Sequence, residues 1–186
     1  MRKVILYIAV SLDGFIAREN GELDWLPGAD GELDQSGEDC GYKLFFDSID
    51  TVLMGRKTYE QILSFGGEYP YKSKQSFVFS RDSSLSSFEK NITFINEDLE
   101  LFTKELKASP GKNIWLNGGA ELLSSFFGKK LVDELMLFVV PVTIGRGISL
   151  FSQASIENKF ELVASQSYSK GFSKGMVKLH YLLKKP

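Results

Sequence analysis

TVLMGRKTYE (residues 51–60) joins an apolar strand to a helix through a single glycine. Its first four residues carry no charge and are β-branched or apolar, which predicts a strand buried on both faces. A strand, Gly55 and a helix start, in that order, let the backbone approach a ligand at the positive end of a helix. Arg56 and Lys57 each cost a few tenths of a kcal/mol at that end unless an anion binds there. The pattern therefore favours a phosphate site over the alternative, a helix start exposed to solvent.

Composition indicates an ordinary globular protein. The chain has 186 residues, of which 43% are hydrophobic and 25% charged, so we expect one domain over residues 1–186, neither disordered nor embedded in a membrane. The formal net charge of −2 excludes a general nucleic-acid binder. The cationic pair in the opening stretch is therefore a local feature.

Cysteine and histidine usage excludes a disulfide-linked protein and a zinc protein. Cys40 is the one cysteine and His180 the one histidine, so the chain has no intrachain disulfide and no zinc-ligand spacing. No apolar run approaches the roughly 18 residues of a membrane span, and the N-terminus enters a strand without a leader-like segment. We expect a soluble cytoplasmic protein without a metal.

Periodicity predicts an α/β fold with parallel βαβ units early and an antiparallel hairpin late. Eight strands are expected, at residues 4–10, 51–54, 76–79, 92–95, 113–117, 135–140, 160–168 and 176–183. Four helices are expected, at about 38–48, from 56 onward, after an N-cap at Asn96, and at 120–127. Gly118-Gly119 forms a second junction of strand, glycine and helix.

The segment 11–27 is predicted to be a lid rather than a simple connection. It carries Ile16 and Trp25, whose apolar surfaces need something to cover. Trp25 either belongs to the lid or forms a wall of the substrate site, and the sequence does not separate the two roles. Asp13 is expected to cap a loop rather than to act in catalysis.

Four motifs in this order resemble the dihydrofolate reductase superfamily, and most closely the branch of the C-terminal reductase domain of the bifunctional bacterial riboflavin-biosynthesis enzyme. The motifs are SLDGFIA at 11–17, VLMGRKTYE at 52–60, WLNGGA at 115–120 and PVTIGRG at 141–147. The resemblance covers nearly the whole chain. It implies a dihydrofolate reductase-like fold, with a central, mostly parallel eight-stranded sheet, a C-terminal antiparallel hairpin and about four flanking helices.

The resemblance implies NADPH as cofactor and assigns residues to it. Arg56, Lys57 and Thr58, after Gly55, would hold the phosphates, and the helix N-terminus following the second glycine junction would face the pyrophosphate. The full set of implied cofactor residues is Ala9, Ile16, Gly55, Arg56, Lys57, Thr58, Ser80, Arg81, Asn117, Gly118, Gly119 and Ala120. Within it, Ser80 and Arg81 would lie beside the adenosine 2′-phosphate, and Ala9 and Ile16 beside the nicotinamide. The Gly118–Gly119 peptide bond would be cis.

The resemblance also implies a catalytic carboxylate at the start of the helix before the GRKT-type strand. Asp39 lies sixteen residues before Gly55 and meets that spacing. A carboxylate there would bind a pterin- or pyrimidine-like ring and assist proton delivery. An exposed first-turn acid is the alternative, and Asp30 and Asp34 compete if the loop holds an insertion. Trp25 and Tyr42 are the implied substrate-binding residues.

Two departures argue against folate itself as substrate. Between residues 60 and 75 the chain has no arginine to clamp a glutamate tail, only Lys72 and Lys74, and a lysine does not replace a bidentate fork. The threonine expected near the middle of strand 135–140 is also absent. We therefore expect an NADPH-dependent reductase of another heterocycle, of riboflavin-biosynthesis type and homodimeric by resemblance. The alternatives are a silent dinucleotide-binding sensor or carrier and a flavin reductase.

Overall fold

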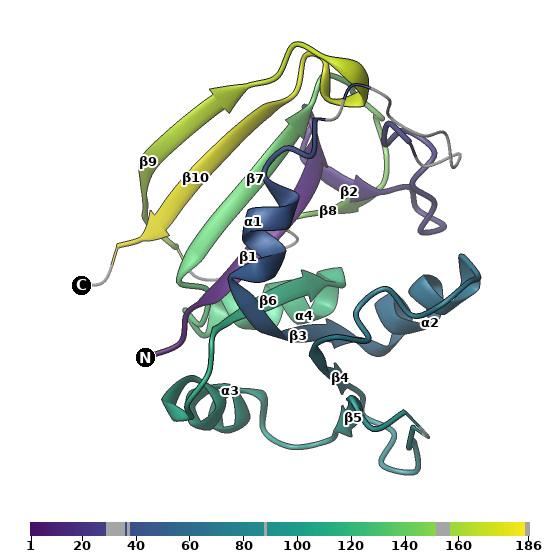
Figure 1. Cartoon of the computed structure of the whole chain (residues 1–186), viewed down its shortest axis with the longest axis vertical. Coiled ribbons are helices and arrows are strands. Elements are labelled where there is room, and N and C mark those ends of the chain that lie inside the picture. Colours follow the sequence, from purple (N-terminus) through teal and green to yellow (C-terminus); the bar gives the residue numbers. More distant parts are fainter. Residues whose placement is uncertain (29–35, 37, 88, 152–156, 185–186) are drawn as a thin grey trace.

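The computed structural model of the protein describes residues 1–28, 36, 38–87, 89–151 and 157–184. Its centre is an eight-stranded sheet in the order β5-β4-β3-β6-β1-β7-β10-β9 (Figure 1). The strands of this sheet are β1 (Val4–Ser11), β3 (Ile49–Gly55), β4 (Gln75–Phe79), β5 (Ile92–Ile95), β6 (Asn113–Gly118), β7 (Glu134–Val140), β9 (Phe160–Ser167) and β10 (Val177–Leu183). Neighbouring strands are parallel from β5 to β7, and β10 is antiparallel to both β7 and β9. This confirms the predicted α/β fold with a C-terminal antiparallel hairpin.

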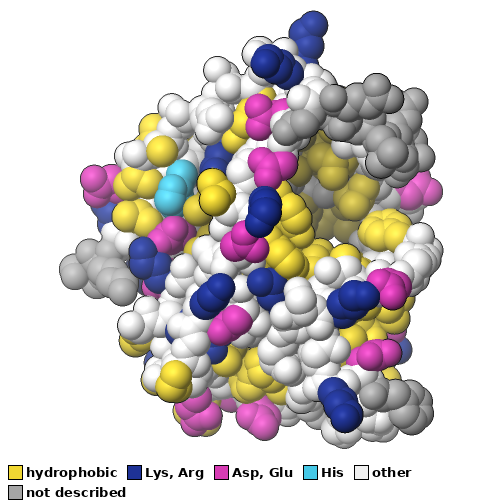
Figure 2. Space-filling model, viewed as in Figure 1, with side chains coloured by type: hydrophobic (Ala, Val, Ile, Leu, Met, Phe, Trp, Pro, Cys, Tyr) yellow, Lys and Arg dark blue, Asp and Glu magenta, His cyan; other side chains and the backbone are white. Residues whose placement is uncertain are grey.

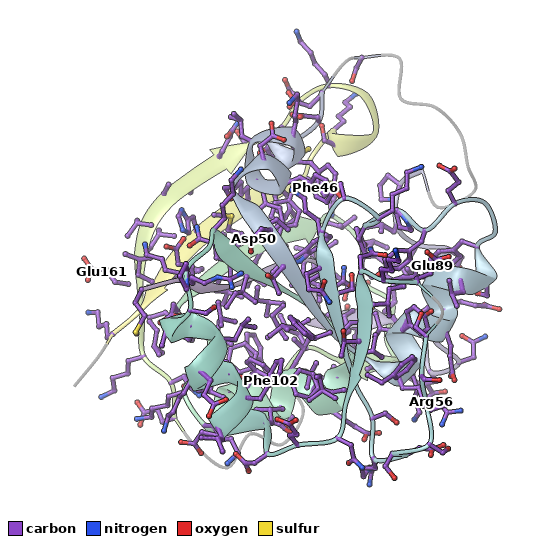
Figure 3. The ribbon with its side chains drawn as sticks, turned by 60° about the horizontal axis from the view of Figure 1, so that its bottom comes forward. Phe46, Asp50, Arg56, Glu89, Phe102 and Glu161 are labelled. Carbon is purple, nitrogen blue, oxygen red and sulfur yellow. The ribbon has the colours of Figure 1, made fainter. Side chains whose placement is uncertain are left out.

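Helices cover both faces of the sheet. They are α1 (Tyr42–Asp47), α2 (Arg56–Ser64), α3 (Leu99–Ala108) and α4 (Ala120–Gly128), with a short 3-10 turn, η1 (Gly171–Ser173), in the hairpin. Alternate residues of β1 point to two separate cores, as strand geometry requires. Val4 and Leu6 pack in the core under α3 and α4, whereas Ile5 and Tyr7 pack in the core under α1 and α2. Figure 3 shows the two layers, with Phe46 of α1 and Phe102 of α3 on opposite sides of the sheet.

Two short strands that the sequence did not predict organise the lid segment. β2 (Phe15–Ala17) pairs antiparallel with β8 (Ile148–Ser149), away from the main sheet. A Cβ added at Gly147 would lie 2.2 Å from the Ala17 carbonyl oxygen, so only glycine allows this close approach. The lid thus begins as a strand held by the 141–147 loop.

Two predicted helix starts are corrected. α1 begins at Tyr42, not near residue 38, because Cys40 and Gly41 have φ of 54° and 77° and a left-handed backbone cannot continue a helix. Asp98, not Asn96, caps α3, and its side chain accepts a hydrogen bond from the Leu101 N–H at 2.8 Å.

Candidate functional site

The central strands separate at their carboxyl ends. The register of β1 with β6 ends at Leu6 and Leu116, while the register of β1 with β7 runs on to Ser11 and Val140. Connections leave in opposite directions here, since β1 leads to β3 on one side and β6 leads to β7 on the other. Ligands of open α/β sheets bind at such a switch point, outside the carboxyl ends of the strands.

The N-termini of α2 and α4 come together beside this separation. Each helix follows its strand directly, through Gly55 or Gly119, and neither has a side-chain cap, so their first N–H groups are available to a ligand. A Cβ added at Gly119 would lie 3.0 Å from the Thr58 hydroxyl oxygen, and one at Gly55 would lie 3.9 Å from the Gly118 carbonyl oxygen. The Gly118–Gly119 peptide bond is cis, as the resemblance implies. These residues form a backbone cradle that suits a pyrophosphate.

Three cations surround the cradle and are paired with carboxylates. Lys57 and Arg81 both contact Glu121, at 3.6 and 3.2 Å, and their side chains are 91% and 95% exposed. Arg56 bonds to Glu60 at 2.6 Å and lies 3.5 Å from Asp82. Exposed pairs of this kind contribute about 0–1 kcal/mol, so an incoming phosphate can replace the carboxylates at small cost.

Ser80 lies in the same region, at the end of β4. Its hydroxyl accepts a hydrogen bond from the Asp82 N–H at 3.1 Å, and its own N–H donates to the Ile95 carbonyl at 3.0 Å. The structure therefore gathers the predicted phosphate residues of α2, α4 and the β4 end around one cradle.

Aromatic side chains line the α1 and α2 face next to the strand separation. Trp115 is at their centre, with ring centroids 5.1 Å from Tyr71, 5.3 Å from Phe45 and 6.2 Å from Tyr42. Its indole N–H donates to the Tyr7 carbonyl at 3.2 Å, which bridges β6 and β1 where their pairing has stopped. In Figure 2 the surface is hollowed to the right of α1 and above α2, with hydrophobic side chains at its base. Trp115 and Phe45 are the buried part of this apolar wall, and Tyr42, 38% exposed, is the ring of the group that is open to a flat ligand.

One polar pair interrupts this wall. The Asn117 side-chain N–H donates to the Tyr71 hydroxyl at 3.0 Å. Burial raises the pKa of Tyr71, so its hydroxyl keeps its proton across the physiological range. Sequence reasoning did not single out Tyr71, because this contact joins it to a residue far along the chain.

The lid is held at two points, one near its start and one inside it. Asp13 accepts hydrogen bonds from the Ser11 hydroxyl at 2.6 Å and from the Gly145 N–H at 2.7 Å, so the structure shows the loop-capping contacts expected for it. Gln61 of α2 donates to the Gly21 carbonyl at 2.7 Å and ties the lid to the helix beside the cradle.

The lid's two apolar residues have different surroundings. Ile16 packs against the core under α3 and α4. The indole N–H of Trp25 is buried and has no hydrogen-bond partner in the described part of the chain. Its partner could therefore come from a ligand, although the role of Trp25 stays a prediction.

Asp39 has the contacts of a capping residue. Its carboxylate is exposed and accepts hydrogen bonds from the Gly41 and Lys43 N–H groups at 2.8 and 3.1 Å. These backbone donors lower the pKa of Asp39, which keeps it ionised at neutral pH. Its catalytic role stays a prediction, and the competing Asp30 and Asp34 lie outside the described residues.

The two lysines before β4 are engaged elsewhere. Lys74 donates to the carbonyls of Phe46 and Ile49, at 2.8 and 2.9 Å, and so satisfies the C-terminal end of α1. Lys72 pairs with Glu68 at the surface. Both lysines thus have partners within the protein, and the expectation that folate is not the substrate stays a prediction.

Comparison with known proteins identifies the family. The profile of the RibD C-terminal domain matches residues 2–174, so the chain belongs to that family. The uncharacterized protein YwjB of Bacillus subtilis is 41% identical over 97% of this chain and 98% of its own length.

Solved structures agree on the fold. A putative riboflavin biosynthesis protein from Shewanella has a TM-score of 0.84 at 26% identity, covering 98% of this chain and 99% of its own. Dihydrofolate reductase from Enterococcus faecalis, solved with NADP(H), has a TM-score of 0.67 at 15% identity, covering 98% and 97%. The fold is therefore that of the dihydrofolate reductases.

Two kinds of feature are absent from the described residues. None of their helices is both long enough and apolar enough to span a membrane. Within the same residues, no three histidine, cysteine or acidic side chains gather closely enough to hold a metal ion.

Proposed function

We propose that the protein is an NADPH-dependent reductase of a small heterocyclic molecule. The observation that carries this proposal is the meeting of two uncapped helix N-termini beside the point where β1 and β6 separate. The helix N-termini can bind the phosphates of an elongated ligand, and the opening between the strands can hold its other end. Membership of the RibD C-terminal domain family supports the same conclusion.

The residues present fit the cofactor. The N–H groups at the start of α4 would bind the pyrophosphate, with Arg56, Lys57 and Thr58 contributing charge and a hydroxyl. Ser80 and Arg81 would bind the adenosine 2′-phosphate, which distinguishes NADPH from NADH. Bound NADPH would supply a hydride.

The remaining predicted residues would complete the reaction site. Ala9, near the carboxyl end of β1, and Ile16 of the lid would flank the nicotinamide, and Asn117, at the carboxyl end of β6, would also contact the cofactor. Tyr42, whose side chain is exposed, would pack against the planar substrate, and Trp25 would close the lid over it. Closing such a site excludes water and holds the reactants together, which is the main contribution of the chain to hydride transfer.

Thermal stabilisation by equal concentrations of NADPH and NADH tests the cofactor assignment. We expect a larger rise in melting temperature with NADPH, and its loss in Arg56→Ala and Arg81→Ala. Lys104→Ala removes a surface cation from α3 and is the matched control, with an unchanged response. No shift with either cofactor at millimolar concentration would refute the proposal.

A second candidate is a dinucleotide-binding sensor or carrier without turnover. The exposed position of Asp39 favours it, because that carboxylate has no observed contact with the aromatic wall. Oxidation of NADPH in the presence of a panel of pterins and pyrimidines separates the two, since the carrier predicts tight binding and no oxidation.

The proposal includes a cytoplasmic homodimer joined through its C-terminal strands. β9 is an edge strand, and all of its residues except Phe160 are exposed. Leu162 and Val163 are 51% and 46% exposed, which is apolar surface that a second subunit could cover. Light scattering tests this point, and a monomer at micromolar concentration would contradict it.

A further inference from the structure

We infer that the hydroxyl of Tyr71 donates a hydrogen bond to the substrate heterocycle in this site. The inference rests on the proposed reductase function and names a catalytic group for it. Tyr71 lies in the connection between α2 and β4, and its hydroxyl meets Asn117 at the carboxyl end of β6.

The hydrogen-bond pattern fixes which way the hydroxyl proton points. The Asn117 side-chain nitrogen can only donate, so the Tyr71 oxygen accepts, at 3.0 Å. No described residue accepts the proton of the Tyr71 hydroxyl, which leaves it for a ligand. The neighbouring Tyr69 differs, because its hydroxyl meets the Ser76 hydroxyl at 2.8 Å, a partner that can accept its proton.

The position of the pair places this free donor where a substrate would lie. Asn117 bonds to Tyr71, which packs with Trp115 in the core under α1 and α2, so both β6 side chains lie on that side of the sheet. The ring of Tyr71 packs edge-on against Trp115 at 5.1 Å and also contacts Phe46 at 6.4 Å. These contacts hold the ring rigidly, so the hydroxyl is preorganised beside the opening between β1 and β6.

The chemistry needs a donor at this point. When a hydride adds to the carbon of a ring C=N or C=O group, the carbon–hydrogen bond takes the hydride's electron pair and the π pair moves to the nitrogen or oxygen. That atom then needs a proton, which the Tyr71 hydroxyl can donate while solvent returns one to the tyrosine oxygen. Asp39, ionised and exposed, is poorly placed for this step.

Binding of the pteridine lumazine without cofactor tests the inference directly. Tyr71→Phe keeps the ring and removes only the hydroxyl, and we expect it to raise the lumazine dissociation constant roughly tenfold. Tyr69→Phe is the matched control, because it removes a neighbouring hydroxyl that already has a partner, and we expect less than about a twofold change. Calorimetric titration at pH 7 measures both, and a circular dichroism melt of each variant verifies its fold.

A second variant keeps the test decisive if Tyr71→Phe is unstable. Asn117→Ala leaves the tyrosine intact but frees its hydroxyl to rotate, and we expect weaker lumazine binding in the same direction. Equal affinity of wild type and Tyr71→Phe, equal losses in the two phenylalanine variants, or no lumazine binding by the wild type would each overturn the inference. NADPH stabilisation separates this failure from that of the reductase proposal, since Tyr71→Phe should keep the wild-type NADPH response.

Discussion

The two ends of the central sheet carry similar charged side chains in opposite surroundings. At the amino end of the strands, Lys107 and Asp133 pair at 2.6 Å with side chains only 10% and 14% exposed. At the carboxyl end, the side chains of Lys57 and Arg81 are 91% and 95% exposed. The first pair is part of the folded core, whereas the second group of cations is open to solvent.

β3 connects the two ends of the sheet, with Asp50 near its start and Arg56 directly after its end (Figure 3). Arg2, 6% exposed, is bonded to both Asp50 and Thr51, so its charge is fully used within the protein. Breaking a buried pair costs about 3–5 kcal/mol, but an exposed one about 0–1 kcal/mol. The amino end therefore stabilises the fold, and the carboxyl end can exchange its partners for a ligand.

The largest expected effect comes from breaking the buried pair. Lys107→Met keeps most of the apolar stem but removes the buried ammonium that bonds to Asp133 at 2.6 Å, and should lower the free energy of unfolding by about 3–5 kcal/mol. Lys104→Met breaks an exposed pair with Glu100 on the same helix and should cost less than about 1 kcal/mol. Urea denaturation measures both, and equal losses would show that the two environments do not differ as described.

Substituting one glycine at each end of the sheet tests the difference between the two ends. Gly111, at the amino end, has φ of 150°, and an added Cβ would lie 2.7 Å from an Asp50 carboxylate oxygen. Gly111→Ala should therefore lower stability by more than about 1 kcal/mol while leaving NADPH affinity unchanged.

Substitution of Gly119, at the carboxyl end, should affect NADPH binding more than stability. Its φ of −64° suits alanine, but the Cβ would press on the Thr58 hydroxyl at 3.0 Å, in the proposed phosphate cradle. Gly119→Ala should weaken NADPH binding roughly tenfold, about 1.4 kcal/mol, with a smaller loss of stability. Titration calorimetry measures the NADPH affinity of both variants, and urea denaturation measures their stability. If both variants lose affinity and stability to the same extent, the two ends of the sheet do not differ in role.

The strands and the glycine junctions were predictable because their signals are local. The apolar run ending at Gly55 predicts a buried strand followed by a helix start, and the structure has both. The same holds for Gly118-Gly119 before α4. Burial on both faces makes a central strand continuously apolar, so the pattern is visible without knowing its neighbours.

The remaining features depend on contacts that no local pattern records. β2 and β8 have three and two residues, too few for a periodicity. The predicted start of α1 was wrong because the left-handed backbone at Cys40 sets the observed start. A helical spacing of apolar residues does not reveal that backbone conformation. The role proposed for Tyr71 depends on its hydrogen bond with Asn117, 46 residues away, and an isolated tyrosine gives no sign of such a partner.

The smallest expected effect concerns the loop that holds the lid. The Ser11 hydroxyl, with the N–H groups of Gly145 and Ile144, lowers the pKa of Asp13 below its ordinary value of 3.8. Because the folded protein binds this proton less readily than the unfolded chain, the contribution to stability is complete above pH 3.8 and disappears as the pH falls through the lowered pKa. The melting temperature of Asp13→Asn should thus lie slightly below that of wild type at pH 7, and the gap should close under acid conditions.

The contacts of Asp13 make the melting temperature of Asp13→Asn informative about the lid. Asp13 joins the turn after β1 to the 141–147 loop, which leads into β8, so its contacts act between segments far apart in sequence. Asp47 is a suitable control, since its pKa is also lowered, by Lys43, but within one turn of α1. If Asp47→Asn changes the melting temperature as much as Asp13→Asn does, the loop contact has no special role. A gap for Asp13→Asn that persists at a pH low enough to protonate Asp13 in the folded protein would mean that lost packing, not the carboxylate charge, causes the change.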